Sequence, residues 1–300
     1  MKKRKILFTG ILFVMVFCVS FYGQQGPSQK AGMQNNPAEA AKALPKAKPP
    51  SVTKHTISIG GKSVSYTATV GEMIVNKPDE KPGASMFYIA YTRNDIQDKS
   101  KRPITFAFNG GPGSSSVWLH LGGLGPRRVA MDDEGYSTSP PFAMTDNENS
   151  LIDVTDLVFI DPVSTGYSRP LPGENKSQFH GVQEDVASVG EFIRLFITKN
   201  KRWDSPKFVL GESYGTTRSA GLSGFLQGRT HGMYLNGIIL VSSVLDFSTI
   251  VFMPGNLMPY ILFLPHYSTT AWYHKKLPAE LQGLPLEELV DKAEKFALEE

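Results

Sequence analysis

Ser213 stands at the centre of a Gly-x-Ser-x-Gly motif, which reads GESYG at residues 211–215. A short apolar segment at residues 208–210 precedes the motif, and a helical pattern begins at Tyr214. A strand, a sharp turn and a helix in this order present a serine hydroxyl as a nucleophile for acyl transfer. Glycines on both sides of the serine remove Cβ atoms that would collide in such a turn. The motif therefore predicts a nucleophilic serine, and a chance match without function is the alternative.

A second chemical signal lies upstream, where residues 105–116 read TFAFNGGPGSSS directly after an apolar segment. Successive glycines let backbone N–H groups turn inward and form a donor site for an oxyanion. We expect one donor from this loop and the other from Tyr214, the residue after the serine. The stretch matches neither glycine-rich phosphate-binding pattern, which disfavours a phosphate cradle. The alternative interpretation, a loop without a function, remains open.

The surrounding segments predict the scaffold that positions these two signals. Residues 55–70 alternate polar and apolar around Gly60-Gly61, which is typical of an antiparallel hairpin. After it, short apolar segments alternate with a helical spacing, which predicts an α/β fold with a mostly parallel sheet covered on both faces. The expected strands are residues 86–92, 104–108, 157–160, 208–210 and 238–241, and the expected helices are residues 180–200 and 214–227.

Residues 250–300 break this alternation. An apolar stretch interrupted by prolines comes first, and a charged helix is expected from Leu286 onward. We interpret this segment as the start of a helical lid insertion above the core at residues 52–249. The last helix would end in two glutamates, which oppose the helix dipole at that end. The sequence is therefore expected to be a fragment whose C-terminal part is missing.

The N-terminus reads as an export signal at residues 1–23. It begins with the basic run MKKRK, and the apolar run at residues 6–19 is shorter than the ~20 residues of a spanning helix. An uncleaved membrane anchor is the alternative. Residues 24–51, rich in Gln, Asn, Ala, Lys and Pro, predict a disordered linker. We therefore expect a periplasmic or extracellular protein.

Composition excludes several classes of function. Hydrophobic residues make up 41% of the 300, so wholesale disorder is excluded. The net charge is +3, and four of the cations lie in the first five residues, so charge does not favour a nucleic-acid partner. The single cysteine, Cys18, excludes a disulfide framework within the chain. Acidic residues, histidines and the cysteine show no metal-ligand spacing, so neither a metal nor a cofactor is expected.

Three stretches together resemble the serine carboxypeptidases, which have the α/β-hydrolase fold. They are FNGGPGSSS at residues 108–116, NSLIDVTDLVFIDPVSTGYS at 149–168 and VLGESYGT at 209–216. The resemblance implies that Ser213 is the nucleophile of a serine-type hydrolase. It also implies that the backbone N–H groups of Gly111 and Tyr214 form the oxyanion hole.

The same resemblance implies a peptide with a free C-terminus as the substrate and release of its last amino acid through an acyl-enzyme. Asn109, Gly110 and Glu212 match the positions that bind the terminal carboxylate. Activity at acidic pH is implied as well, because an ionised Glu212 would repel that carboxylate. The chain departs from the family at Gly123, where many members have a glutamate that pairs with the one before the serine. It departs again at Ala107, in place of a tryptophan.

The family completes its triad with an aspartate and then a histidine after the serine. The acidic and histidine candidates after Ser213 are Asp246, Asp291, His231, His266 and His274. The segment around Asp246 resembles a stretch of the family that does not contain the triad aspartate. We therefore expect the triad aspartate and histidine to be absent and the chain alone to have little or no activity, and a triad of Asp246 with His266 or His274 is the alternative.

Two other functions stay open on the same residues: an esterase or acyltransferase on this fold, and a noncatalytic exported protein that binds peptides. Among the remaining polar residues, the sequence context of His120 favours a role in the core over a role as a catalytic base. Asp161 is a turn cap or a cleft residue, and Tyr167 is a candidate pocket residue. Glu184 and Asp185 fall in the first turn of a helix, where negative charge suits the helix dipole.

Overall fold

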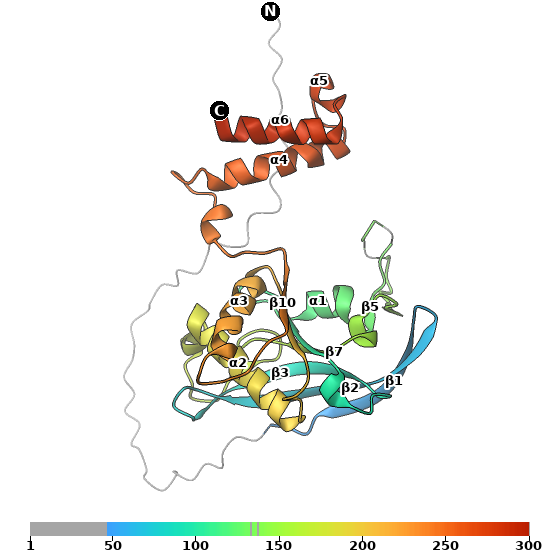
Figure 1. The fold of residues 1–300 in the computed structure, drawn as a ribbon, viewed down its shortest axis with the longest axis vertical. Helices are drawn as coiled ribbons and strands as arrows, with labels where there is room; N and C mark the ends of the chain where they lie inside the picture. Colours follow the sequence, from blue (N-terminus) through green and yellow to red (C-terminus); the bar gives the residue numbers. More distant parts are fainter. Residues whose placement is uncertain (1–46, 133, 137, 300) are drawn as a thin grey trace, which may run out of the picture. The chain divides into compact units, whose positions relative to one another are not determined.

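The computed structural model describes residues 47–132, 134–136 and 138–299. All of them belong to one compact unit within Leu44–Glu300, shown as a ribbon in Figure 1. The predicted export signal and the predicted linker as far as residue 46 lie outside the described residues. The first strand begins at Ser51, one residue before the expected start of the folded part.

A mixed sheet forms the centre of the described chain, in the strand order β1-β2-β3-β7-β4-β9-β10. The first pairings, from β1 to β7, are antiparallel, and those from β7 to β10 are parallel. The strands are β1 (Ser51–Ile59), β2 (Lys62–Asn76), β3 (Pro82–Arg93), β4 (Ile104–Phe108), β7 (Asp156–Ile160), β9 (Lys207–Glu212) and β10 (Gly237–Val241).

The predicted hairpin is confirmed as β1 and β2, which pair antiparallel with Ile59 opposite Lys62. Its two-residue turn has φ of +55° at Gly60 and +75° at Gly61. Positive φ at both central residues is the geometry whose twist suits a two-residue hairpin, and glycine adopts it without strain.

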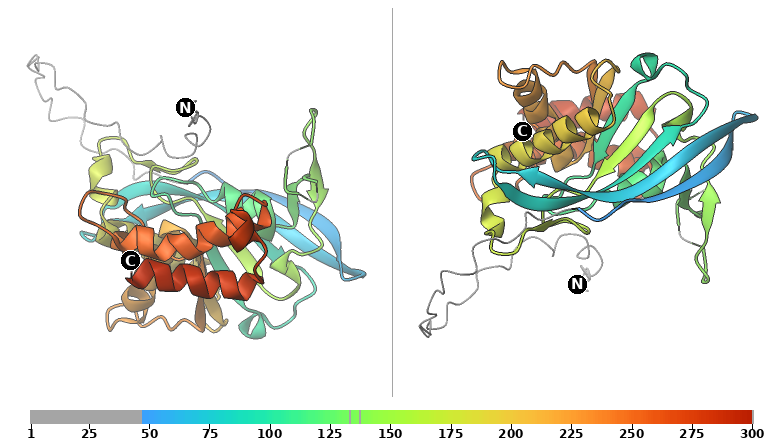
Figure 2. Two further views of the ribbon diagram at one scale, coloured as in Figure 1. Left: turned by 90° about the horizontal axis from the view of Figure 1, so that it is seen from above. Right: turned by 90° about the horizontal axis from the view of Figure 1, so that it is seen from below.

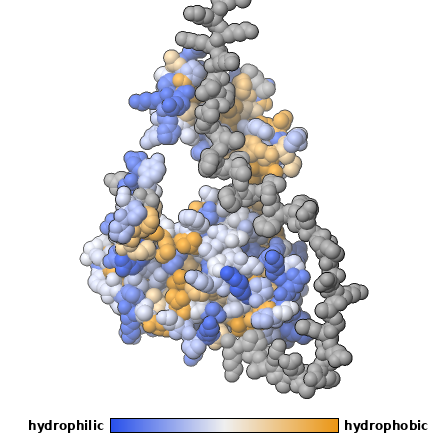
Figure 3. Space-filling view, turned by 180° about the vertical axis from the view of Figure 1, so that it is seen from behind, coloured by the Kyte–Doolittle hydropathy of each residue, from blue (hydrophilic) through white to orange (hydrophobic). Residues whose placement is uncertain are grey.

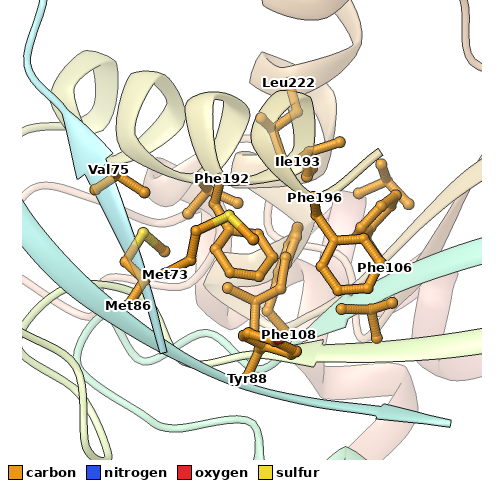
Figure 4. Packing of buried hydrophobic residues seen from close by; sticks show 14 of the residues in the cluster. Met73, Val75, Met86, Tyr88, Phe106, Phe108, Phe192, Ile193, Phe196 and Leu222 are labelled. Atoms are coloured by element: carbon orange, nitrogen blue, oxygen red, sulfur yellow. The ribbon is translucent and has the colours of Figure 1, made fainter. Parts of the chain in front are cut away.

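Two long helices cover one face of the sheet, α2 (Val182–Lys199) and α3 (Tyr214–Gln227). Their apolar side chains pack on those of the strands, as Figure 4 shows. Phe196, for example, stands edge-on to Tyr88 and Phe106, with ring centroids 5.4 and 5.7 Å away. Burying one such phenylalanine contributes about 1.5–3 kcal/mol to folding. The helix expected at residues 180–200 is thus confirmed as α2, which begins at Val182.

Shorter helical segments cover the opposite face. Apolar residues of three strands form a second cluster there, against which Leu119, Leu124 and Leu151 pack. These leucines come from α1 (Val117–Leu119), η3 (His120–Leu124) and η4 (Leu151–Asp153). The expectation of a sheet covered on both faces is thus confirmed.

The segment after residue 250 forms three helices, α4 (Met258–Tyr273), α5 (Ala279–Gln282) and α6 (Leu286–Glu299). The sequence predicted a helical insertion over residues 250–300, with a helix from Leu286 but no helix bounds in the part interrupted by prolines. Helix α4 occupies that part, with Pro259 in its first turn and Pro265 inside it. A proline in the first turn costs no hydrogen bond. Helices α4 and α6 lie side by side (Figure 2). The role of this segment as a lid stays a prediction.

Several short elements were not predicted. Strands β5 (Arg127–Val129) and β6 (Met144–Asp146) form a separate hairpin, and β8 (Arg169–Pro170) pairs with β3. Single helical turns occur at η2 (Lys99–Lys101), η5 (Lys176–Phe179) and η6 (Phe247–Thr249). Each is too short to leave a periodic pattern in the sequence.

Strand β10 lies at one edge of the described sheet and is only partly covered. Its apolar side chains Ile238, Ile239 and Val241 are 37%, 40% and 39% exposed. Patches of hydrophobic residues also interrupt the polar surface in the view of Figure 3. Over the described ranges, none of the helices has the length and apolar character needed to span a membrane.

Candidate active site

Ser213 occupies a sharp turn between the end of β9 and the first residue of α3. Its backbone has φ of +57° and ψ of −127°, which is strained for a residue with a side chain. Its N–H donates to the carbonyl of Val241 over 2.9 Å, and its carbonyl accepts from the hydroxyl of Thr216 over 2.7 Å. These bonds hold the strained turn in place, and Ser213 itself stays partly exposed.

The glycines of the motif allow this turn. A Cβ atom on Gly211 would lie 2.0 Å from the carbonyl oxygen of Gly215, closer than any real contact. A Cβ atom on Gly215 would lie 3.0 Å from the carbonyl oxygen of Phe108, at the end of β4. Gly211 therefore needs a residue without a side chain, and Gly215 leaves little room for one, for the reason that the sequence indicated.

The glycine-rich loop after β4 lies directly against this turn. A Cβ atom on Gly110 would lie 2.4 Å from the backbone nitrogen of Tyr214. Gly111, the next residue, has φ of +106°, a conformation that glycine adopts without strain. Among residues 47–132, 134–136 and 138–299, no hydrogen-bond acceptor is found for the N–H of Gly111 or of Tyr214. One of these two available donors thus directly follows Ser213, and the other follows Gly110, which approaches the turn closely.

Asn109 links this loop to the residue before the serine. Its side-chain oxygen accepts from the N–H of Leu119 over 3.0 Å, and its Nδ2 donates to Oε2 of Glu212 over 2.9 Å. Asn109 is only 2% exposed, so these bonds set the orientation of its amide. Gly123 occupies the position where many family members have a glutamate that pairs with the residue before the serine. Within the described part of the chain, Asn109 instead hydrogen-bonds to the carboxylate of Glu212.

Asp161 holds the neighbouring loop rather than facing the turn at Ser213. One carboxylate oxygen accepts from the N–H of Ser116 over 2.9 Å. A Cβ atom on Gly166 would lie 1.8 Å from its other oxygen. Burial raises the pKa of Asp161, and the N–H groups of Ser116 and Tyr167 partly offset this. Tyr167 is exposed and packs against Phe87, with ring centroids 5.1 Å apart.

His120 is a buried core residue, as its sequence context favoured. Its Nε2 lies 2.7 Å from the hydroxyl of Tyr91, and its ring lies 4.6 Å from that of Phe159. Burial lowers the pKa of His120 to about 4, so the ring is neutral at pH 7.

The triad candidates after Ser213 do not come together. Asp246 caps η6 by accepting from the N–H of Ser248 over 2.9 Å, and its hydrogen bonds with Ser248 lower its pKa. His266 lines a groove of 450 Å³ between α4 and α6, and His274 stands edge-on to the ring of Tyr273. Over the described residues, neither histidine hydrogen-bonds to Asp246 or Ser213.

A buried network beside the turn was missed at the sequence level. The carboxylate of Asp185 accepts from Nε of Arg218 over 2.8 Å and from the hydroxyl of Tyr214 over 3.0 Å. Burial and this carboxylate raise the pKa of the Tyr214 hydroxyl to about 12. The signal was present in the sequence, since Arg218 stands four residues from both Tyr214 and Leu222 on the apolar side of α3. Its partner Asp185 was interpreted only as a charge that suits the helix dipole.

A cavity of 330 Å³ opens beside this network. Pro112 and Gly113 of the glycine-rich loop, Tyr214 and Arg218 of α3, and Ser164 and His180 are among its lining residues. In the ranges that the structure describes, no cluster of three or more histidines, cysteines or acidic residues is arranged to hold a metal ion.

Comparison with known proteins identifies the family. The model of the serine carboxypeptidase family matches residues 70–249, which is more than half of the chain. The chain belongs to the serine carboxypeptidase family. The matched residues include the glycine-rich loop and the turn at Ser213 described above.

Relatives in the serine carboxypeptidase family match only part of their own length. The pheromone-processing carboxypeptidase KEX1 of Saccharomyces cerevisiae is 33% identical over 123 residues, which are 40% of this chain and 16% of that protein. The serine carboxypeptidase-like protein 36 of Arabidopsis thaliana is 28% identical over 155 residues, which are 50% of this chain and 29% of that protein. The chain thus spans less than a third of these two relatives.

A solved structure of this family shows the same fold. The crystal structure of Kex1(delta)p, a prohormone-processing carboxypeptidase from Saccharomyces cerevisiae, aligns with a TM-score of 0.50 and 18% identity. The alignment covers 78% of this chain and 53% of that one. The predicted α/β-hydrolase fold is therefore confirmed.

Proposed function

We propose that this chain carries the nucleophile and the oxyanion site of an exported serine carboxypeptidase. The observation that supports this most directly is the close approach of Gly110 to the backbone nitrogen of Tyr214, the residue after the strained turn at Ser213. Family membership supports the reaction class, and the fold supports the position of the site after the parallel strands.

The proposed reaction is acyl transfer. The hydroxyl oxygen of Ser213 attacks the carbonyl carbon of the last peptide bond, and its proton passes through a general base to the leaving amine. The N–H groups of Gly111 and Tyr214 stabilise the oxyanion that forms, and one such donor lowers the barrier by about 3 kcal/mol. Water then hydrolyses the ester on Ser213 and frees the shortened peptide.

Recognition of the free C-terminus would fall to Asn109, Gly110 and Glu212. The hydrogen bond between Asn109 and Glu212 already places an amide donor and a carboxyl group side by side. A protonated Glu212 can donate to the terminal carboxylate of the peptide, whereas an ionised one repels it. We therefore propose that the protonated form of Glu212 is the one that admits a free-acid peptide.

We expect slow turnover by the 300-residue chain alone, because no described histidine hydrogen-bonds to Ser213. An oxyanion site without a complete triad still accelerates acyl transfer by about 10³-fold. A fluorophosphonate should therefore label Ser213 slowly, as peptide mapping by mass spectrometry would show. Ser213→Ala should abolish the label, and Ser242→Ala is the matched control at another serine with positive φ. A label that survives Ser213→Ala, or no label at all, would refute this role.

Substrate recognition can be tested without turnover. A fluorescent peptide with a free C-terminus should bind at least about tenfold more tightly than its C-amidated form at pH 5, because the amide lacks the anion that Glu212 and Asn109 face. The preference should persist in Glu212→Gln. Equal affinity of the two peptides at pH 5 would exclude the exopeptidase function and favour an esterase.

Export is also part of the proposal, and it depends on the basic and apolar run at residues 1–23, outside the described residues. Expression with its own N-terminus in a bacterial host should yield a periplasmic or secreted chain that has lost this run. N-terminal sequencing of that chain is the measurement. An intact N-terminus retained in the membrane fraction would indicate an anchor instead.

A further inference from the structure

We propose that the buried ion pair of Arg218 and Asp185 positions the oxyanion loop. This inference rests on the proposed function, because it assigns a role to residues that act through Asn109 and Tyr214. Arg218 and Asp185 are both buried, and Arg218 is 2% exposed. They come from α3 and α2, the two helices on the face of the sheet described above.

The guanidinium of Arg218 joins three elements at once. Its Nε donates to Asp185 over 2.8 Å, and its Nη1 donates to the carbonyl oxygen of Asn109 over 2.9 Å. The group also lies over the rings of Phe108 and Tyr214, at 4.9 and 5.1 Å from their centroids. A planar group with a fixed fork of donors suits this arrangement, and an ammonium cannot reproduce both bonds.

Asp185 is the common reference point for both proposed oxyanion donors. It bonds directly to the hydroxyl of Tyr214, whose N–H is one donor. Through Arg218 it bonds to the carbonyl of Asn109, two residues before Gly111, whose N–H is the other donor. The distance between the loop and the first turn of α3 is therefore set from one carboxylate.

Stability alone does not account for the pair. An apolar pair of similar volume is often as stable as a buried ion pair or more so, because both charges lose their hydration. An apolar pair would leave the carbonyl of Asn109 without its donor, at the point where the loop leaves β4. The ion pair thus supplies directional bonds that a packed core would not.

The chain offers a matched control in the pair of Arg202 and Asp156. Arg202 is also 2% exposed, and its Nη1 donates to Asp156 over 2.5 Å. This pair lies at the beginning of β7, whereas the glycine-rich loop follows the end of the parallel strand β4. Replacing Arg202 therefore disturbs a comparable buried charge at the opposite end of the sheet.

Hydrogen exchange on the whole chain tests the inference without turnover. The N–H groups of Ser114 and Leu119 are suitable reporters, because they donate to Gly110 and to the side chain of Asn109. We expect Arg218→Lys to accelerate their exchange by about tenfold or more, the effect of losing one charge-assisted hydrogen bond. Arg202→Lys should leave both rates within about twofold once global stability is matched with urea.

A double variant separates positioning from stability. Asp185→Leu with Arg218→Met removes both charges, so the melting temperature should recover relative to Arg218→Met alone. Exchange at Ser114 and Leu119 should stay fast, because the donor to Asn109 is still missing. Fluorophosphonate labelling of Ser213 should slow by about tenfold in Arg218→Lys and remain unchanged in Arg202→Lys.

The inference is overturned if Arg218→Lys leaves the two exchange rates unchanged, or if Arg202→Lys accelerates them equally. It is also overturned if exchange recovers together with the melting temperature in the double variant. A natural chain that takes no label refutes the proposed function of Ser213 instead, and the exchange rates still decide whether the pair positions the loop.

Discussion

Nδ2 of Asn109 lies 2.9 Å from Oε2 of Glu212, and this bond joins residues that are 103 positions apart. One belongs to the loop after β4 and the other ends β9, directly before Ser213. The glycine-rich loop and the turn at Ser213 are therefore one structural unit. A substitution in the loop should change the stability of the turn, and a substitution in the turn should change that of the loop.

Reversing this hydrogen bond tests the unit. Asn109→Asp puts a second carboxylate beside Glu212, and we expect it to lower the free energy of unfolding by about 2–3 kcal/mol at pH 7. Adding Glu212→Gln restores a donor and an acceptor, so the double variant should recover most of the loss. Urea unfolding of the four chains as a double-mutant cycle measures the coupling. Additive single effects would show that the two side chains do not interact.

Gly110 should tolerate no side chain. Gly110→Ala places a Cβ atom 2.4 Å from the nitrogen of Tyr214, a backbone atom that cannot move without moving α3. We expect a loss of about 3 kcal/mol in the free energy of unfolding, the upper part of the range for overpacking. Gly224→Ala is the control, because its Cβ has nothing within 4 Å and lies inside α3. That variant should gain about 0.5–1 kcal/mol.

The strain at Ser213 should be measurable as stability. Its φ of +57° with ψ of −127° favours glycine, so Ser213→Gly should be about 1 kcal/mol more stable than Ser213→Ala. Ser223→Gly is the matched control, since Ser223 lies within α3 and glycine lowers stability there. Thermal unfolding of the variants gives the comparison. If Ser213→Gly were less stable than Ser213→Ala, the turn would be unstrained.

His120 should make the fold sensitive to acid. Its pKa is lowered from 6.5 to about 4 by burial, so between these values the unfolded chain binds a proton that the folded chain does not. The free energy of unfolding should therefore fall as the pH drops from 6.5 to 4, by at most about 3 kcal/mol from this residue.

Urea unfolding at pH 7 and pH 4.5 measures this dependence. His120→Gln keeps a polar group near the hydroxyl of Tyr91 and should flatten it. His180→Gln is the control at an exposed histidine. The same acid sensitivity in His120→Gln as in the natural chain would assign the effect to other groups.

The part of the fold nearest Ser213 could be predicted because its signals are local. The expected helix at residues 214–227 coincides with α3, and the apolar segment before the motif is β9. The glycines at positions 211 and 110 predicted a sharp turn and a close approach of two backbone segments. A Cβ atom at either position would collide with the backbone of residue 215 or 214, which is the reason. The roles of Ser213 and Gly111 in catalysis stay predictions.

What could not be predicted depends on contacts between distant segments. Arg218 and Asp185 become partners only because α2 and α3 pack together, which no window of the sequence reveals. The bounds of helix α4 could not be predicted, because Pro265 argues against a helix locally. Packing against α6 outweighs that preference in the folded chain.

The open strand β10 bears on how the chain can be handled in the laboratory. It lies at the border of the described sheet, and its side chains Ile239 and Val241 are partly exposed. Such a border recruits other extended polypeptides, including further copies of itself. Concentrated solutions should therefore turn cloudy sooner than dilute ones, and a lysine in place of Ile239 should keep them clear.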